Sequence, residues 1–199
     1  MEKSELNKIR IRKITKVAIL SALAGILMIF ETVLPLMPPF LKIDLSDIPA
    51  LVGAFALGPI NGIIIEFIKN LIHLPFTSTL GVGEVANFVI GSFFIGTAGL
   101  IYKYKKTKGG AVLGMLFGTI AMTIASTVAN YFVMLPFYAA LFHMKMDDIV
   151  AMSAAVNSMV KDVKTLIVFA FVPFNIFKGL VISLLTALLY KRISLLLHK

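Results

Sequence analysis

The chain contains no cysteine and very little charge. The absence of cysteine among its 199 residues excludes disulfide bonds, thiolate metal sites and thiol catalysis. Charged residues make up 15% of the chain, whereas soluble globular domains carry about 25%. Apolar residues make up 59%, and several uncharged stretches approach the roughly 20 residues that a helix needs to cross a bilayer. The composition therefore indicates a polytopic membrane protein.

Motifs of common enzymes are absent as well. The sequence has no Gly-x-x-x-x-Gly-Lys-Ser/Thr loop, no His-Glu-x-x-His and no Gly-x-Ser-x-Gly, so these routes to ATP hydrolysis, zinc proteolysis and serine hydrolysis are excluded. Arginine occurs only at positions 10, 12 and 192. A pocket elsewhere would lack the arginine fork that usually binds phosphate, which argues mildly against a phosphorylated ligand.

The net charge of +9 is concentrated in clusters beside apolar runs. Six of the nineteen basic residues lie in the first sixteen positions, Lys103–Lys108 contains four more, and Lys191, Arg192 and Lys199 lie near the C-terminus. Such clusters are typical of cytoplasmic loops, so we expect cytoplasmic termini and no nucleic-acid partner. The apolar run after the basic N-terminus lacks a small-residue cleavage site, so we expect a retained first helix.

The expected fold is all-α, a single membrane domain with a bundle of six transmembrane helices. Clear spans cover 14–34, 85–102, 111–135 and 166–190, and the segment 48–73 is expected to form two short helices broken at Gly58-Pro59. Only six crossings place all three basic clusters on the inner side. A helix of about 11 residues reaches only about 16 Å, so it must be shielded within the bundle. The bundle is then expected over 14–191, with a basic cytoplasmic N-terminus at 1–13 and a cytoplasmic tail at 192–199.

Three outer connections follow from this topology. The first, 35–47, contains three prolines and is expected to be a stiff loop; the second is 74–83. The third, 136–165, is too long for a simple connector. It is expected to hold a short amphipathic helix acting as a lid or lying at the membrane interface, although a solvated loop would explain it equally well.

Lys178 is the most informative single residue. It lies inside the apolar run 166–190, which offers it no carboxylate, and an ammonium at that depth is expensive. We therefore expect it to face a polar cavity that a bound molecule or water fills. Asn175 shares its helix face, and Phe174, Asn130 and Tyr131 are expected nearby; two amides and an ammonium suit the edge of a flat heterocycle.

Other polar residues allow two interpretations each. Glu66, Lys69, Asn70 and His73 share one helix face, either as a structural ion pair or, less favoured, as a metal or proton site. Glu84 could simply complement a helix N-terminus, or it could join Asn87 in binding a ligand. Ser46 or Asp47 could cap the following helix, while Lys42, Asp44 and Leu45 could close over a ligand.

The first span carries Ala18-x-x-x-Ala22, with Ser21 and Gly25 extending the stripe of small residues. Small residues at this spacing let helices approach closely in lipid. The stripe could serve packing inside the bundle or docking to a partner.

Taken together, the motifs resemble a known family. Lys42-Ile43-Asp44-Leu45-Ser46-Asp47-Ile48-Pro49, Gly58-Pro59, Glu66 with Lys69-Asn70, Gly83-Glu84-Val85-Ala86-Asn87-Phe88 and Asn175-x-x-Lys178 resemble the riboflavin-specific substrate-binding (S) components of energy-coupling factor (ECF) transporters. The likeness runs in order over nearly the whole chain, except for the outer connection 137–164.

The resemblance implies a six-helix, non-enzymatic subunit of a prokaryotic cell membrane that binds riboflavin from outside. It would deliver the vitamin through a transmembrane coupling protein and two ATPase subunits. Ala18 and Ala22 would face the coupling protein, the flavin ring would lie against Asn130, Asn175 and Lys178, and the loop at 42–45 would cover the pocket, with Glu84 and Asn87 nearby. Riboflavin would be a transported ligand, and no cofactor is implied.

Two other functions compete with this interpretation. A self-sufficient secondary transporter could use Glu66, Lys69 and His73 as an ion-coupled relay, although no internal repeat is evident. A membrane enzyme could use Glu84 and His73 as acid and base, but the chain shows no recognisable nucleophile or metal-ligand set.

Overall fold

The computed structural model describes residues 2–197, and the side chains of residues 4–189. The fold is all-α, as predicted, with one small hairpin added. The helices are α1 (Glu2–Ile29), α2 (Asp47–Leu57), α3 (Pro59–His73), α4 (Val82–Tyr104), α5 (Lys108–Ala129), α6 (Leu135–Leu141), α7 (Met146–Ala154), α8 (Val163–Leu166) and α9 (Val172–Leu197). A 3₁₀ turn, η1 (Leu74–Phe76), and two π-helical turns, η2 (Asn130–Met134) and η3 (Ile167–Phe171), link some of them.

Three helical stretches within the described residues are long and apolar enough to cross a membrane. They cover Val82–Tyr104, Lys108–Leu141 and Val163–Leu189. The first predicted span ends earlier than expected, because α1 ends at Ile29 rather than at residue 34, although the helix itself begins at Glu2 and has 28 residues. Strand β1 (Thr32–Val33) follows and pairs antiparallel with β2 (Lys42–Ile43), which takes the chain out of the helix. The number of crossings, six, stays a prediction.

The predicted break at Gly58-Pro59 is confirmed. Gly58 has φ +94°, a conformation that L side chains rarely adopt, and Pro59 starts α3, where its missing N–H costs no helical hydrogen bond. Helix α2 has 11 residues, and those from Asp47 to Phe55 are all buried. It packs against α1, α3, α4 and α9, so the short helix is shielded by the bundle, as its length requires.

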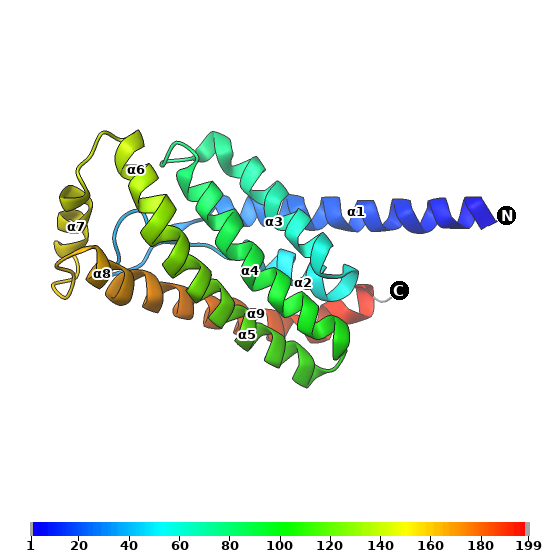
Figure 1. Cartoon of the computed structure of the whole chain (residues 1–199). Helices are drawn as coiled ribbons and strands as arrows, with labels where there is room; N and C mark the ends of the chain where they lie inside the picture. The colour runs from blue at the N-terminus through cyan, green and yellow to red at the C-terminus, as the bar shows by residue number, and fades with distance from the viewer. Residues whose placement is uncertain (1, 198–199) are drawn as a thin grey trace.

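The basic clusters gather at one end of the bundle. Both chain ends and the α4–α5 connection lie together at that end, while α6, α7 and α8 lie at the other (Figure 1). The arrangement of the helices therefore confirms the prediction that the three basic clusters lie on one side of the bundle. Residues 198–199 of the expected C-terminal tail lie outside the described residues.

The end of the bundle opposite the termini has its own apolar cluster. Ile43 from the hairpin, Leu135 from α6, Ile149 from α7 and Leu166 from α8 are all buried in it. Helix α7 confirms the short helix predicted in the long outer connection, and its buried Ile149 shows that this connection is packed onto the bundle. The interpretation of a purely solvated loop is wrong for this part.

Candidate ligand-binding site

A cavity with about 840 Å³ of unfilled space, including its opening to solvent, lies toward this end of the bundle. The polar and aromatic residues that line it are Phe40, Lys42, Asp47, Thr79, Asn87, Ser126, Asn130, Tyr138, Phe171, Phe174, Asn175 and Lys178. Apolar walls with a few polar groups are the usual composition of such sites.

Two lining asparagines are tied together through one serine. Asn175 Nδ2 donates to Ser126 Oγ at 2.8 Å and to the Phe171 carbonyl at 2.8 Å. Asn130 Nδ2 donates to the same Ser126 Oγ at 3.1 Å and to the Ser126 carbonyl at 2.9 Å. Both amide NH₂ groups are thus used within the protein. The two amide oxygens have no hydrogen-bond donor among the described residues, so they are the atoms left to accept from a ligand.

Both asparagines lie beside π-helical turns, and prolines explain the turns. Asn130 begins η2, six residues before Pro136, and η3 ends at Phe171, two residues before Pro173. Proline lacks an N–H and its ring clashes with the carbonyl four residues earlier, so the helix widens locally. Pro173 of α9 releases the carbonyl of Phe169 in η3, which accepts from Asn157 Nδ2 at 3.1 Å. Single π turns of this kind often occur at functional sites.

Lys178 is not the isolated charge that its apolar neighbours suggested. Its Nζ lies 3.2 Å from Asp44 Oδ2 and 3.1 Å from Asp47 Oδ2, and all three side chains are buried. The expectation that only a bound molecule or water compensates this ammonium is therefore wrong. Lys178 nevertheless lines the cavity. An ammonium has three N–H donors; one is used in the hydrogen bond to Asp44 and Asp47 is an ion-pair partner, so at least one donor is left for a ligand.

Asp47 joins Lys178 to a second buried lysine. Lys69 Nζ pairs with Asp47 Oδ1 and with Glu66 Oε1, the latter at 2.8 Å, and it donates to Ser46 Oγ at 2.7 Å. The ion-pair interpretation of the Glu66–Lys69 stripe is confirmed. The capping interpretation is wrong. Ser46 precedes α2 but makes no side-chain capping hydrogen bond, and the Asp47 carboxylate pairs with Lys69 and Lys178 instead.

The loop between β2 and α2 is held in this network by Asp44. Asp44 Oδ1 accepts from the Ser46 N–H at 2.7 Å and from its hydroxyl, while Oδ2 pairs with Lys178. Burial raises the pKa of the Asp44 carboxyl, but the attraction of Lys178 and Lys69 outweighs it, so the pKa lies below its ordinary value. The loop is thereby fixed to α9 by a charged contact across 134 residues of sequence.

A second polar network lies beside the cavity. His73 Nδ1 lies 2.8 Å from Glu84 Oε1, and Thr77 Oγ1 donates to Glu84 Oε2 at 2.8 Å. Lys42 Nζ pairs with Glu31 Oε1 at 2.5 Å and donates to Ser78 Oγ at 2.8 Å. Glu84 therefore does more than complement the start of α4. Within the described residues no group of three or more His, Asp or Glu side chains could hold a metal ion.

The structure brings most of the predicted ligand residues to one cavity. Those that line it are Lys42, Asn87, Asn130, Phe174, Asn175 and Lys178; those that do not are Asp44, Leu45, Glu84 and Tyr131. Asp44 and Glu84 support lining residues or the loops beside them. Leu45 and Tyr131 are exposed. Their roles toward a ligand stay predictions.

The small-residue stripe on α1 divides between two faces. Ser21 and Gly25 are buried, and a Cβ at Gly25 would lie 2.8 Å from Ile72 Cγ2 of α3. That part of the stripe serves packing inside the bundle. Ala18 and Ala22 are exposed, which leaves their face of α1 open to a partner.

Sequence reasoning missed several lining residues. Ser126 and Phe171 each lie four residues before a predicted asparagine, on the same helix face, so helical spacing could have found them. Phe40 and Tyr138 gave no such signal. The Phe40 ring lies 6.0 Å from Phe171 and 6.1 Å from Tyr138, between centroids, and this contact depends on how a proline-rich loop folds over α6 and η3.

The fold and the cavity define a helical membrane protein with several spans that binds a small molecule. The sequence profile of the ECF transporter substrate-specific component matches residues 12–190. The chain belongs to this family and is the substrate-binding subunit of an ECF transporter. Membership in this family does not favour the hypothesis of a self-sufficient, ion-coupled secondary transporter. Similar proteins are named as transporters, which weighs against the hypothesis of a membrane enzyme.

Individual relatives agree with the family assignment. The chain is 36% identical over 190 residues to the riboflavin transporter RibU of Staphylococcus aureus (strain TCH60), covering 96% of this chain and 94% of the relative. It is 33% identical to the riboflavin transporter FmnP of Bacillus subtilis (strain 168), covering 93% of each. A solved structure of the S component of a bacterial ECF transporter superposes with a TM-score of 0.76 at 35% identity, covering 96% of this chain and 99% of that one.

Proposed function

We propose that this subunit binds riboflavin in the cavity between α4, α5 and α9. The observation that carries the proposal is the set of ligand-facing groups at Asn130, Asn175 and Lys178, two amide oxygens and at least one ammonium donor left over by the protein's own hydrogen bonds. Two similar relatives are named riboflavin transporters. On the flavin pyrimidine edge, the N–H can donate to one amide oxygen and an adjacent carbonyl can accept from the Lys178 ammonium, while the second amide oxygen can accept from a hydroxyl of the sugar-like tail.

The cavity walls suit the faces of a flavin ring. Phe40, Phe171 and Phe174 line the cavity, and the Phe40 and Phe171 rings lie within 27° of parallel. Aromatic rings stack favourably in offset arrangements with centroids 4.5–7 Å apart, a gain of about 0.5–1.5 kcal/mol per pair. Such walls give a flat, largely apolar ring system more contact than they give a sugar or an amino acid.

The charges on the cavity favour an uncharged ligand. Three charged residues line it, and each is already paired: Lys42 with Glu31, Asp47 with Lys69, and Lys178 with Asp44 and Asp47. A phosphate would have to compete with these carboxylates for the lysines, at a high cost for each buried pair. Riboflavin itself therefore fits better than its phosphorylated forms.

Delivery of the vitamin requires partners. We place the cavity on the outer side of a prokaryotic cell membrane, with both termini cytoplasmic, because the basic clusters gather at the opposite end. A transmembrane coupling protein would dock on the exposed face of α1 at Ala18 and Ala22. Two ATPase subunits would supply the energy, since the chain itself has no phosphate-binding loop.

A binding titration tests the proposal. Purified protein should quench riboflavin fluorescence with one site per chain, and protein from cells grown with riboflavin should be yellow. FMN should bind more weakly. A colourless protein that leaves added riboflavin fluorescence unchanged would refute the assignment of the ligand, although not the membership in the family.

A further inference from the structure

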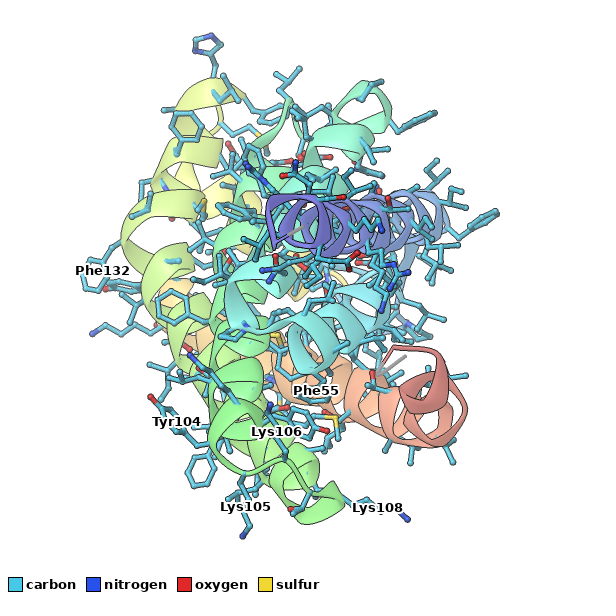
Figure 2. The ribbon with its side chains drawn as sticks, turned by 90° about the vertical axis from the view of Figure 1, so that its right-hand side faces the viewer. Phe55, Tyr104, Lys105, Lys106, Lys108 and Phe132 are labelled. Atoms are coloured by element: carbon cyan, nitrogen blue, oxygen red, sulfur yellow. The ribbon has the colours of Figure 1, made fainter. Side chains whose placement is uncertain are left out.

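A second hollow lies at the end of the bundle that carries the termini. It holds about 900 Å³ of unfilled space, including its opening to solvent. It lies between α1, the turn that joins α2 to α3, and the end of α4. Figure 2 looks onto this end and shows Phe55 and Lys106 close together there, with Lys105 and Lys108 farther out.

Three lysines from two segments of the chain line this hollow. Lys13 comes from α1, Lys103 from the last turn of α4, and Lys106 from the α4–α5 connection. None of the three has an ion-pair or hydrogen-bond partner within the described part of the chain, and no acidic residue lines the hollow. Three ammonium groups that face one space without a counter-charge repel one another, so the hollow favours an anion.

The other wall of the hollow is apolar. Phe55 and Tyr102 form a ring pair with centroids 4.7 Å apart, and both are buried. Pro59 and Ile60 form the rim at the start of α3, and Ile60 is 71% exposed. The hollow therefore combines a cationic side with an apolar side that opens outward.

We propose that this hollow binds the headgroup of an anionic phospholipid, with its glycerol and upper acyl chain against Phe55, Pro59 and Ile60. Basic pockets between transmembrane helices on the cytoplasmic side are recognised sites for such headgroups. Lysine binds phosphate as a point charge. Inorganic phosphate or a soluble phosphate ester would satisfy the lysines but would leave the apolar rim in water, so a lipid covers more of the site.

The basic cluster supplies a matched control. Lys103 and Lys106 line the hollow, whereas Lys105 and Lys108 do not, yet all four are exposed and belong to one six-residue cluster. The double variants Lys103→Gln/Lys106→Gln and Lys105→Gln/Lys108→Gln therefore lose the same charge at nearly the same place. They differ only in which lysines face the hollow.

Native mass spectrometry of full-length protein, from detergent mixed with phosphatidylglycerol or phosphatidylcholine, measures the bound lipid. The wild type and the Lys105/Lys108 variant should retain one phosphatidylglycerol. The Lys103/Lys106 variant should bind it about 25-fold more weakly, since each lysine beside an anionic lipid contributes on the order of fivefold. Phosphatidylcholine should bind weakly to all three.

Several results would overturn the proposal. Equal loss in both variants would mean unspecific charge attraction, and no loss in either would mean that the hollow binds no lipid. Displacement of phosphatidylglycerol by millimolar inorganic phosphate would assign a soluble phosphate site. Retained lipid with lost co-purification of the coupling protein would assign a protein interface. Riboflavin titration of each variant checks folding and keeps this test separate from that of the proposed function.

Discussion

Replacing Lys178 by methionine would remove one of two lysines that balance three buried carboxyl groups. Asp44, Asp47 and Glu66 would then share Lys69 alone. Removing one partner of a buried ion pair costs about 3–5 kcal/mol, because it leaves an uncompensated charge. For a chain of this size that is a fall in the unfolding temperature on the order of 10 °C. Differential scanning fluorimetry of the detergent-purified protein without ligand would measure it.

The same change should weaken riboflavin binding for a separate reason. Lys178 has at least one N–H left for the ligand, and a hydrogen bond to a charged group contributes about 1.5–3 kcal/mol. Its loss corresponds to a Kd about 10- to 150-fold higher. Fluorescence quenching at a temperature where the variant is folded would give this number.

A double variant separates the two effects. In Lys178→Met/Asp44→Asn the removed ammonium and the removed carboxylate offset one another, and the amide can still accept from Ser46 as Asp44 does now. We expect most of the lost stability to return while the Kd stays high. A double variant with the wild-type Kd would refute the contact between Lys178 and the ligand. A single variant as stable as the wild type would refute the charge balance.

Three further predictions concern other parts of the molecule. Asn175→Ala should raise the riboflavin Kd up to about tenfold, since a neutral hydrogen bond contributes about 0.5–1.5 kcal/mol; an unchanged Kd in the titration would contradict its role. The double variant Ala18→Trp/Ala22→Trp should bind riboflavin normally but fail to co-purify with the coupling protein, and retained co-purification would count against docking on this face. Asn157→Ala removes the donor to the Phe169 carbonyl and should make the connection 155–162 more sensitive to limited proteolysis, so cleavage at the wild-type rate would argue against that tether.

Local patterns predicted much of the fold because their physics is local. The break at Gly58-Pro59 follows from a backbone conformation suited to glycine and from the missing N–H of proline. Helix α7 was expected from the length and composition of its connection. The end of α1 was predicted five residues too late: the apolar run ends at Phe30, and pairing of Thr32–Val33 with Lys42–Ile43 turns the next residues into a strand.

The candidate site was predicted only in part, because some of its contacts join segments that are far apart in the sequence. Spacing alone predicts that Asn175 and Lys178 share a helix face. Asn130 was predicted near them because a polar side chain within a membrane span needs a polar partner. The link between the two amides through Ser126 joins helices 49 residues apart in sequence. No spacing rule reaches that far, so the orientation of the amides became visible only in the folded chain.

The sequence by itself determined that this chain is a helical membrane protein with a polar cavity. An unpaired polar group in the hydrocarbon region costs free energy, so each polar residue within an apolar span indicates that a polar partner or cavity lies beside it. Only the tertiary structure decided how those groups are paired. It brought Asp44, from the loop after β2, and Asp47, at the start of α2, to the ammonium of Lys178. It paired Glu84 with His73 and left it outside the cavity lining. Ion pairs between distant segments depend on which helices pack together, and that choice is made by the whole bundle.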